Sequence, residues 1–170
     1  MAKAYTVTSD PFYINGSVTE SGANTYTEIQ ISAPLDSLNR EGLLVHAVYF
    51  TGSTPDLVPG ATSRIDLQVT TTSKTGIVNA NDANLLAQRE AITSGGVAEF
   101  SGPHIKDMVA NTDSFSSDMQ LGIVATDDLY LAILGANQGS AKNGQCRIVC
   151  SRIKLSADAY AALVTNELSS

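Results

Sequence analysis

Short stretches of alternating apolar and polar residues, separated by turn-forming residues, recur along most of this chain. In residues 64–70, for example, Ile65, Leu67 and Val69 alternate with polar side chains. Because successive side chains of a strand point to opposite faces of a sheet, this period of two predicts strands with one buried face. We expect strands at residues 5–8, 12–14, 26–31, 43–50, 64–70, 97–100, 105–109, 119–125, 129–134 and 145–155.

Turn-forming residues separate several of these stretches. Asn15-Gly16 and the run 21–24 are rich in residues that tolerate a positive φ or bond to their own backbone, so both are predicted turns. Residues 126–128 are predicted to form a tight hairpin between the strands that flank them.

Helical spacing occurs in two places. Between residues 81 and 93, Asn81 or Asp82 can cap a helix whose apolar side chains share one face, and Gly95 follows it, which predicts a short internal helix. Ser156 is a suitable N-cap for a second helix at the C-terminus. The apolar face of that helix comprises Tyr160, Leu163, Val164 and Leu168.

Together these elements predict a mainly β fold. About eight short strands with polar turns and only two helices favour an antiparallel β-sandwich of the jelly-roll type over an alternating strand-helix fold. The 170 residues, 43% of them apolar, are enough for one substantial core. Since neither a repeat nor a linker divides the chain, we expect residues 1–170 to form a single domain.

The chain offers little material for catalysis. It contains no nucleophile elbow, dinucleotide fingerprint, phosphate loop or paired-histidine zinc motif. Its only imidazoles are His46 and His104, and the first lies in an apolar strand, where a hydrogen-bonded core or interface histidine is the expected role. We therefore expect no enzymatic activity, no catalytic residue, no metal or other cofactor and no small-molecule substrate.

The acids and cysteines also favour structural roles. Calcium is an alternative for four acids if their loops meet, but their spacing matches no calcium loop, so turn and capping roles are favoured. These acids are Asp113, Asp118, Asp127 and Asp128. Cys146 and Cys150 lie four residues apart in a predicted strand, about 13 Å at about 3.3 Å per residue, which is too far for a disulfide. We expect two buried free thiols.

Charge is distributed unevenly. The net charge of −7 argues against a protein that neutralises many phosphates. Residues 129–157 nevertheless contain no acid and four cations, Lys142, Arg147, Arg152 and Lys154. A solvated strand face is the favoured interpretation, and a surface that faces an anionic partner is the alternative.

Targeting signals are not apparent. Residues 1–6 contain neither a long apolar segment nor a small-residue cleavage site, so no signal peptide is expected. The longest apolar run, residues 43–50, is too short to span a bilayer. We expect a protein made in the cytoplasm that remains soluble.

Two predicted strands are apolar on both faces. An antiparallel sheet usually buries one face and exposes the other, so the second face of residues 43–50 and of 129–134 needs a cover. The two predicted helices or other copies of the chain could supply it. The candidate core or assembly residues are Leu43, Val45, His46, Tyr49, Leu129, Leu131 and Ile133.

The chain resembles the single jelly-roll coat proteins of icosahedral viruses, chiefly in residues 127–155, which contain the run Asp-Asp-Leu-Tyr-Leu-Ala-Ile-Leu-Gly-Ala-Asn-Gln-Gly and the following strand. The resemblance implies a capsid subunit of the virion, made in the host cytoplasm, that binds copies of itself, with further virion proteins as a second class of partner. Many such coats carry a basic N-terminal arm, whereas here only Lys3 precedes the first strand. Residues 142–154 are therefore the segment expected to make weak contact with nucleic acid or membrane. The alternative function is a non-catalytic binding module, such as a fibre, adhesin or carbohydrate-binding β-sandwich.

Overall fold

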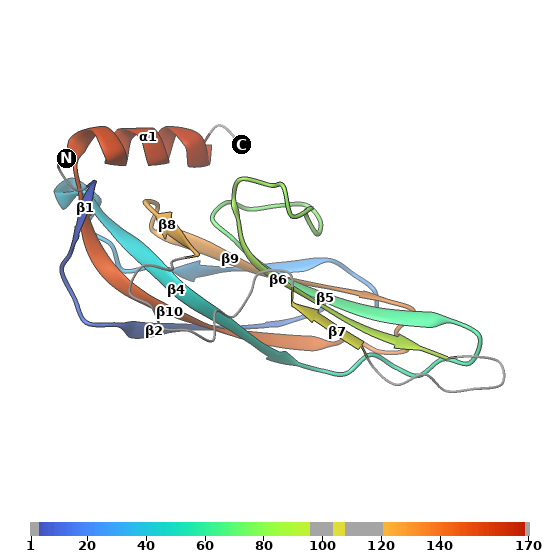
Figure 1. Cartoon of the computed structure of the whole chain (residues 1–170). Helices are drawn as coiled ribbons and strands as arrows, with labels where there is room; N and C mark the ends of the chain where they lie inside the picture. The colour runs from blue at the N-terminus through green and yellow to red at the C-terminus, as the bar shows by residue number, and fades with distance from the viewer. Residues whose placement is uncertain (1–3, 96–103, 108–120, 169–170) are drawn as a thin grey trace.

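Two antiparallel five-stranded sheets pack face to face in the computed structural model, which describes residues 4–95, 104–107 and 121–168 (Figure 1). The predicted strand at 97–100 lies outside these residues. The first sheet contains β1 (Tyr5–Val7), β2 (Phe12–Thr19), β4 (Glu41–Gly52), β8 (Gly122–Val124) and β10 (Asn143–Leu155). The second contains β3 (Thr27–Ser32), β5 (Thr62–Thr70), β6 (Leu85–Ser94), β7 (His104–Asp107) and β9 (Asp128–Ala136). A 3-10 turn, η1 (Ser37–Asn39), and one helix, α1 (Ala157–Leu168), complete the described elements.

The strands form antiparallel pairs, and these pairs wrap around the core so that they are shared between two sheets. β2 pairs with β10, β3 with β9, β4 with β8 and β5 with β6. The wrapping then brings β10 beside β4 and β9 beside β5. The resulting orders, β2-β10-β4-β8 and β3-β9-β5-β6, define a jelly roll, which confirms the predicted fold class.

The core lies between the sheets. Five of the seven candidate core or assembly residues have no measurable exposure and belong to it: Leu43, Val45, Leu129, Leu131 and Ile133. Cys146 and Cys150 are buried free thiols that face the same core, as predicted.

The turn predicted at Asn15-Gly16 is wrong, because both residues lie inside β2. A Cβ atom at Gly16 would collide with the side chain of Ile31 on the facing sheet and would lie 3.2 Å from that of Leu131. Glycine is therefore needed here for the close approach of the sheets rather than for a turn. The turn predicted at 21–24 is present, and Asn24 has the positive φ of 61° that such turns use.

The internal helix predicted over residues 81–93 is also wrong, since most of that segment forms β6. β6 pairs with β5 on one side and with β7 on the other. The pairing sets Asp66 opposite Glu90 and Gln68 opposite Gln88. Because a short apolar run fits either period, hydrogen bonding to two neighbouring strands decides the outcome.

The hairpin predicted around residues 126–128 is a crossover. β8 pairs with β4 in the first sheet, whereas β9 pairs with β3 and β5 in the second. The connection therefore carries the chain from one layer to the other.

The C-terminal helix is confirmed, and it covers part of the outer face of the first sheet (Figure 1). The Ser156 hydroxyl caps it by accepting a bond from the backbone N–H of Ala159 at 3.3 Å. Its apolar side packs on the second face of β4 and β10, at Leu44, Ile153 and Leu155. The cover expected for residues 43–50 is thus supplied in part by the chain itself. No helix among the described residues has the length and apolar character needed to cross a membrane.

Part of the outer face of the second sheet is covered by the connection between β5 and β6. Gln68 on β5 is fully buried. Its amide nitrogen donates to the backbone oxygen of Gly76 at 3.0 Å, and its amide oxygen accepts from the backbone N–H of Val78 at 2.9 Å. Ala132, on the second face of β9, is 1% exposed. The second face of 129–134 is therefore covered in part by its own chain, at Ala132.

Candidate functional site

The outer face of the first sheet carries a surface that α1 does not cover, formed by the adjacent strands β2, β10 and β4. Strand register arranges its side chains in rungs. Arg147 lies between Asn15 and Tyr49, and Gln145 lies between Ser17 and Thr51. A third rung pairs Val149 with Tyr13.

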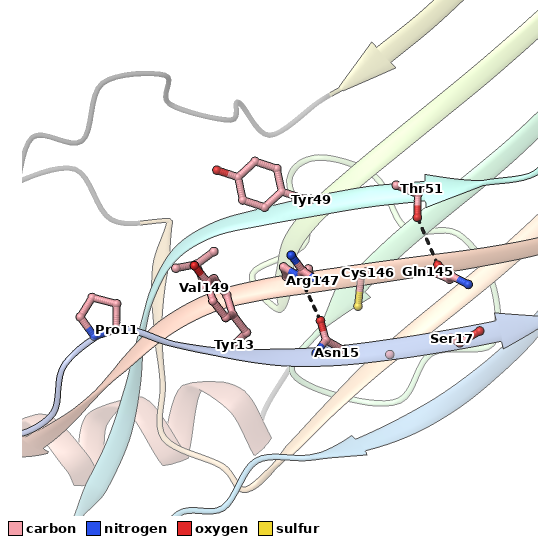
Figure 2. Close-up of a pocket in the computed structure, with 11 residues that line it drawn as sticks. Pro11, Tyr13, Asn15, Ser17, Tyr49, Thr51, Gln145, Cys146, Arg147 and Val149 are labelled. Carbon is pink, nitrogen blue, oxygen red and sulfur yellow. Dashed lines mark hydrogen bonds between the residues drawn. The ribbon is translucent and has the colours of Figure 1, made fainter.

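These rungs line an open hollow of about 880 Å³, which we call the outer hollow (Figure 2). The residues that line it are Pro11, Tyr13, Asn15, Gly16, Ser17, Tyr49, Thr51, Gln145, Cys146, Arg147 and Val149. Two aromatic rings are accessible there, since Tyr13 is 63% exposed and Tyr49 is 37% exposed. Aromatic side chains exposed around a hollow are typical of a binding surface.

Arg147, at the centre of the outer hollow, is held in a fixed orientation. Its Nε donates a hydrogen bond of 3.2 Å to Oδ1 of Asn15, drawn as a dashed line in Figure 2. Its guanidinium carbon lies 5.3 Å from the ring centre of Tyr13, within range of a cation-π interaction. Within the described residues no carboxylate pairs with Arg147, and none lines the hollow. The terminal nitrogens therefore form an oriented fork that suits a carboxylate or a phosphate.

The other three predicted anion-facing residues do not join Arg147. Lys142 is 8% exposed, and its Nζ lies 2.6 Å from Oδ1 of Asp56. That hydrogen bond is the main cause of a lowered pKa of the Asp56 carboxyl.

Arg152 and Lys154 lie on the opposite face of β10 from Arg147. They alternate in step with the core-facing residues of that strand, and the Arg152 guanidinium lies 5.9 Å from the ring centre of Phe12. Lys154 pairs in register with Glu41. The four cations of residues 129–157 therefore do not form one surface.

Sequence reasoning missed a polar cluster at one end of the sandwich, which we call the loop cluster: Glu20, Asn24, Asp56, Gln138 and Lys142. Glu20, Gln138 and Lys142 are buried in it. Glu20 is 4% exposed and accepts three backbone N–H bonds, from Thr25, Gly135 and Lys142. Gln138 accepts from the backbone N–H of Asp56 at 2.9 Å, and its own backbone N–H donates to Oδ1 of Asn24 at 2.7 Å. The cluster joins three connections that are distant in sequence, which is why no local pattern indicates it.

His46 occupies a β-bulge in β4. The residues on either side of it, Val45 and Ala47, pair with Cys150 and Val149, so His46 has no partner in the register. Its Nε2 lies 2.9 Å from the hydroxyl of Ser151, and burial lowers its pKa. The side chain of His104 lies outside the described residues.

The two cysteines and the acids considered as calcium ligands are the remaining titratable groups singled out in the sequence. Burial raises the pKa of both Cys146 and Cys150 to about 11. Among the described residues, no group of three or more His, Cys, Asp or Glu could hold a metal ion. Asp128 accepts a hydrogen bond from Gln30 across the β3-β9 pair, while Asp113 and Asp118 lie outside the described residues.

The fold and this surface define a jelly-roll β-sandwich with an open hollow of aromatic, amide and cationic side chains on one sheet. No protein-family model matches the chain, and no curated protein matches its sequence.

Proposed function

We propose that this chain is a structural, self-assembling protein, a viral capsid subunit that forms a shell from many identical copies. Support comes from the fold, because the jelly roll is an architecture that viral coat domains use. Lectins and cupins use it too, so the fold needs a second observation beside it.

That observation is a pair of exposed leucines in the two connections that flank β4, one before the strand and one after it. Leu38 is 94% exposed and Leu57 is 50% exposed. Leu38 belongs to η1, where the Asp36 carboxylate accepts the backbone N–H of Leu38 at 3.1 Å. Leu57 follows Asp56, which the loop cluster fixes through Lys142.

The separation of the two leucines suits a repeating contact. β4 has 12 residues, so its ends lie about 40 Å apart at about 3.3 Å per residue, in keeping with the long axis in Figure 1. Burying one leucine side chain at an interface is worth about 2 kcal/mol. Contact between two different patches of neighbouring copies is heterologous, and such contacts close into rings or continue into larger arrays.

The proposed setting follows from the same function. Copies of the chain would be the principal partners, further virion proteins would be secondary ones, and the virion would be the final location after synthesis in the host cytoplasm.

Light scattering after size-exclusion chromatography and electron microscopy of the purified full chain test this proposal. We expect large particles for the natural sequence. Leu38→Asp and Leu57→Asp should each give a folded protein of much lower mass, because each places a charge where an apolar contact forms. Thr8→Asp, at an exposed position outside both connections, should leave assembly unchanged. A natural chain that remains a strict monomer across concentration and salt would refute the proposal.

A further inference from the structure

We propose that the outer hollow binds a carbohydrate that carries a carboxylate. This site is independent of self-assembly, since it uses neither Leu38 nor Leu57. It would provide recognition of an acidic glycan by the face of the first sheet that α1 leaves open.

The charge of the site selects for a single anion. Among the described residues that line the hollow, Arg147 is the one cation, and Asn15 and Tyr13 fix its guanidinium plane. The terminal nitrogens of this planar group meet no carboxylate within the described part of the chain, and they match the two oxygens of a carboxylate better than a mobile ammonium would.

The remainder of the hollow suits a sugar ring. The accessible rings of Tyr13 and Tyr49 and the side chain of Val149 provide apolar surface against which the C–H face of a sugar can pack. The polar side chains around them, Asn15, Ser17, Thr51 and Gln145, carry both donors and acceptors, as sugar hydroxyls do. A few oriented polar groups beside apolar surface are the usual composition of a small-ligand site.

The dimensions fit an oligosaccharide of two or three units. Three adjacent strands span about 10 Å, and the five residues from Gln145 to Val149 extend about 13 Å along β10. The volume of about 880 Å³ lies within the range of small-ligand sites.

A nucleic acid fits the same surface poorly. Single strands are held by several cations that follow the phosphate backbone, in addition to stacked bases. Here Lys142 is paired with Asp56, and Arg152 and Lys154 lie on the opposite face of β10. A chain of net charge −7, in which Arg147 is the single cation among the described residues of the hollow, favours a ligand with one carboxylate.

Titration calorimetry and ligand-observed NMR of the full chain test the site, with sialyllactose and a glucuronate-terminated disaccharide as probes and lactose as the neutral control. We expect at least one acidic probe to bind at least tenfold more tightly than lactose. Arg147→Gln should weaken that binding at least tenfold, and Arg147→Lys should restore only part of it. Tyr13→Ala should weaken binding as well. Arg152→Gln removes the same charge from the opposite face and should leave binding unchanged.

Several outcomes would overturn the proposal. The first is that neither acidic probe binds. The second is that Arg147→Gln binds the acidic probe as tightly as the natural chain does. The third is that an oligo(dT) strand displaces the sugar or binds in its place. Circular dichroism and thermal unfolding establish that each variant is folded. Because Leu38→Asp and Leu57→Asp should retain sugar binding, failure of assembly and failure of this site are distinguishable.

Discussion

Replacing Glu20 with glutamine tests whether the loop cluster holds one end of the sandwich together. The Glu20 carboxylate is 4% exposed and bonds three backbone N–H groups. Its Oε1 accepts from Gly135 at 2.7 Å and from Thr25 at 3.2 Å, and its Oε2 accepts from Lys142 at 2.9 Å. Glutamine fills the same space but offers one oxygen and an NH₂ group, so it cannot accept from all three donors.

The expected loss in free energy of unfolding for Glu20→Gln follows from these three hydrogen bonds. Three charge-assisted hydrogen bonds each lose about 1 kcal/mol when the carboxylate becomes neutral, and one buried N–H without an acceptor costs about 2 kcal/mol, a sum of about 5 kcal/mol. Removing the charge recovers part of the desolvation cost of a buried carboxylate. We therefore expect Glu20→Gln to lower the free energy of unfolding by about 3 kcal/mol.

Urea unfolding at pH 7 measures this loss, with Glu28→Gln as the matched control. Glu28 also accepts three bonds, from Tyr26, Ser73 and Lys74, but it is only partly buried, so water can replace lost partners. Its substitution should cost at most about 1 kcal/mol. A Glu20→Gln variant within about 0.5 kcal/mol of the natural chain, or equal losses for the two variants, would refute the reasoning.

Three further predictions concern the core and the second sheet. Burial is the main cause of a pKa of about 6 for Asp66, so the ionised carboxylate destabilises the fold. Lowering the pH from 7 to 4 should therefore stabilise the natural chain by about 2 kcal/mol relative to Asp66→Asn in unfolding measured across that range, and parallel curves would contradict this. Gly16→Val should lower the free energy of unfolding by about 2 kcal/mol through its collision with Ile31, and a neutral effect in chemical denaturation would contradict the close approach of the sheets. Cys146 and Cys150 should react with a thiol reagent at pH 8 far more slowly in the native chain than in urea, and equal rates would show that they are accessible.

Most strands were predictable because alternation is a local property. Residues 64–70 and 145–155 show a period of two, and both form strands at or close to those limits. Apolarity on both faces of residues 43–50 also indicated a cover, which α1 supplies at Leu44. These features depend only on neighbours in the sequence, so pattern reasoning could find them.

The errors arose where distant segments decide the structure. β6 is a strand because β5 and β7 flank it, although its apolar residues also fit one face of a helix. Glycine is needed at position 16 because Ile31 on the facing sheet leaves no room for a side chain, and not because its neighbour Asn15 forms a turn. Residues 126–128 join strands that belong to different sheets, and nothing in those three residues specifies the layer of either strand.

The candidate site was only partly predictable for the same reason. The acid-free stretch pointed to Arg147, but its partner Asn15 lies 132 residues away in sequence. Separation of Arg147 from Arg152 and Lys154 follows from strand alternation once β10 is known to run unbroken from Asn143 to Leu155. The same alternation places Tyr49, a predicted assembly or core residue, on the outer face rather than in the core.

The outer hollow exists because α1 is short relative to the strand it covers. With 12 residues, α1 is about 18 Å long, whereas the 13 residues of β10 extend about 43 Å. The helix therefore shields only part of that strand, at Ile153 and Leu155, and leaves the stretch around Arg147 open. Because the core side of that stretch is occupied by Cys146 and Ile148, the fold is stabilised from one face of β10 and the other face is free to carry recognition. Substitutions of Arg147 can thus change binding without disturbing the contacts that define the jelly roll.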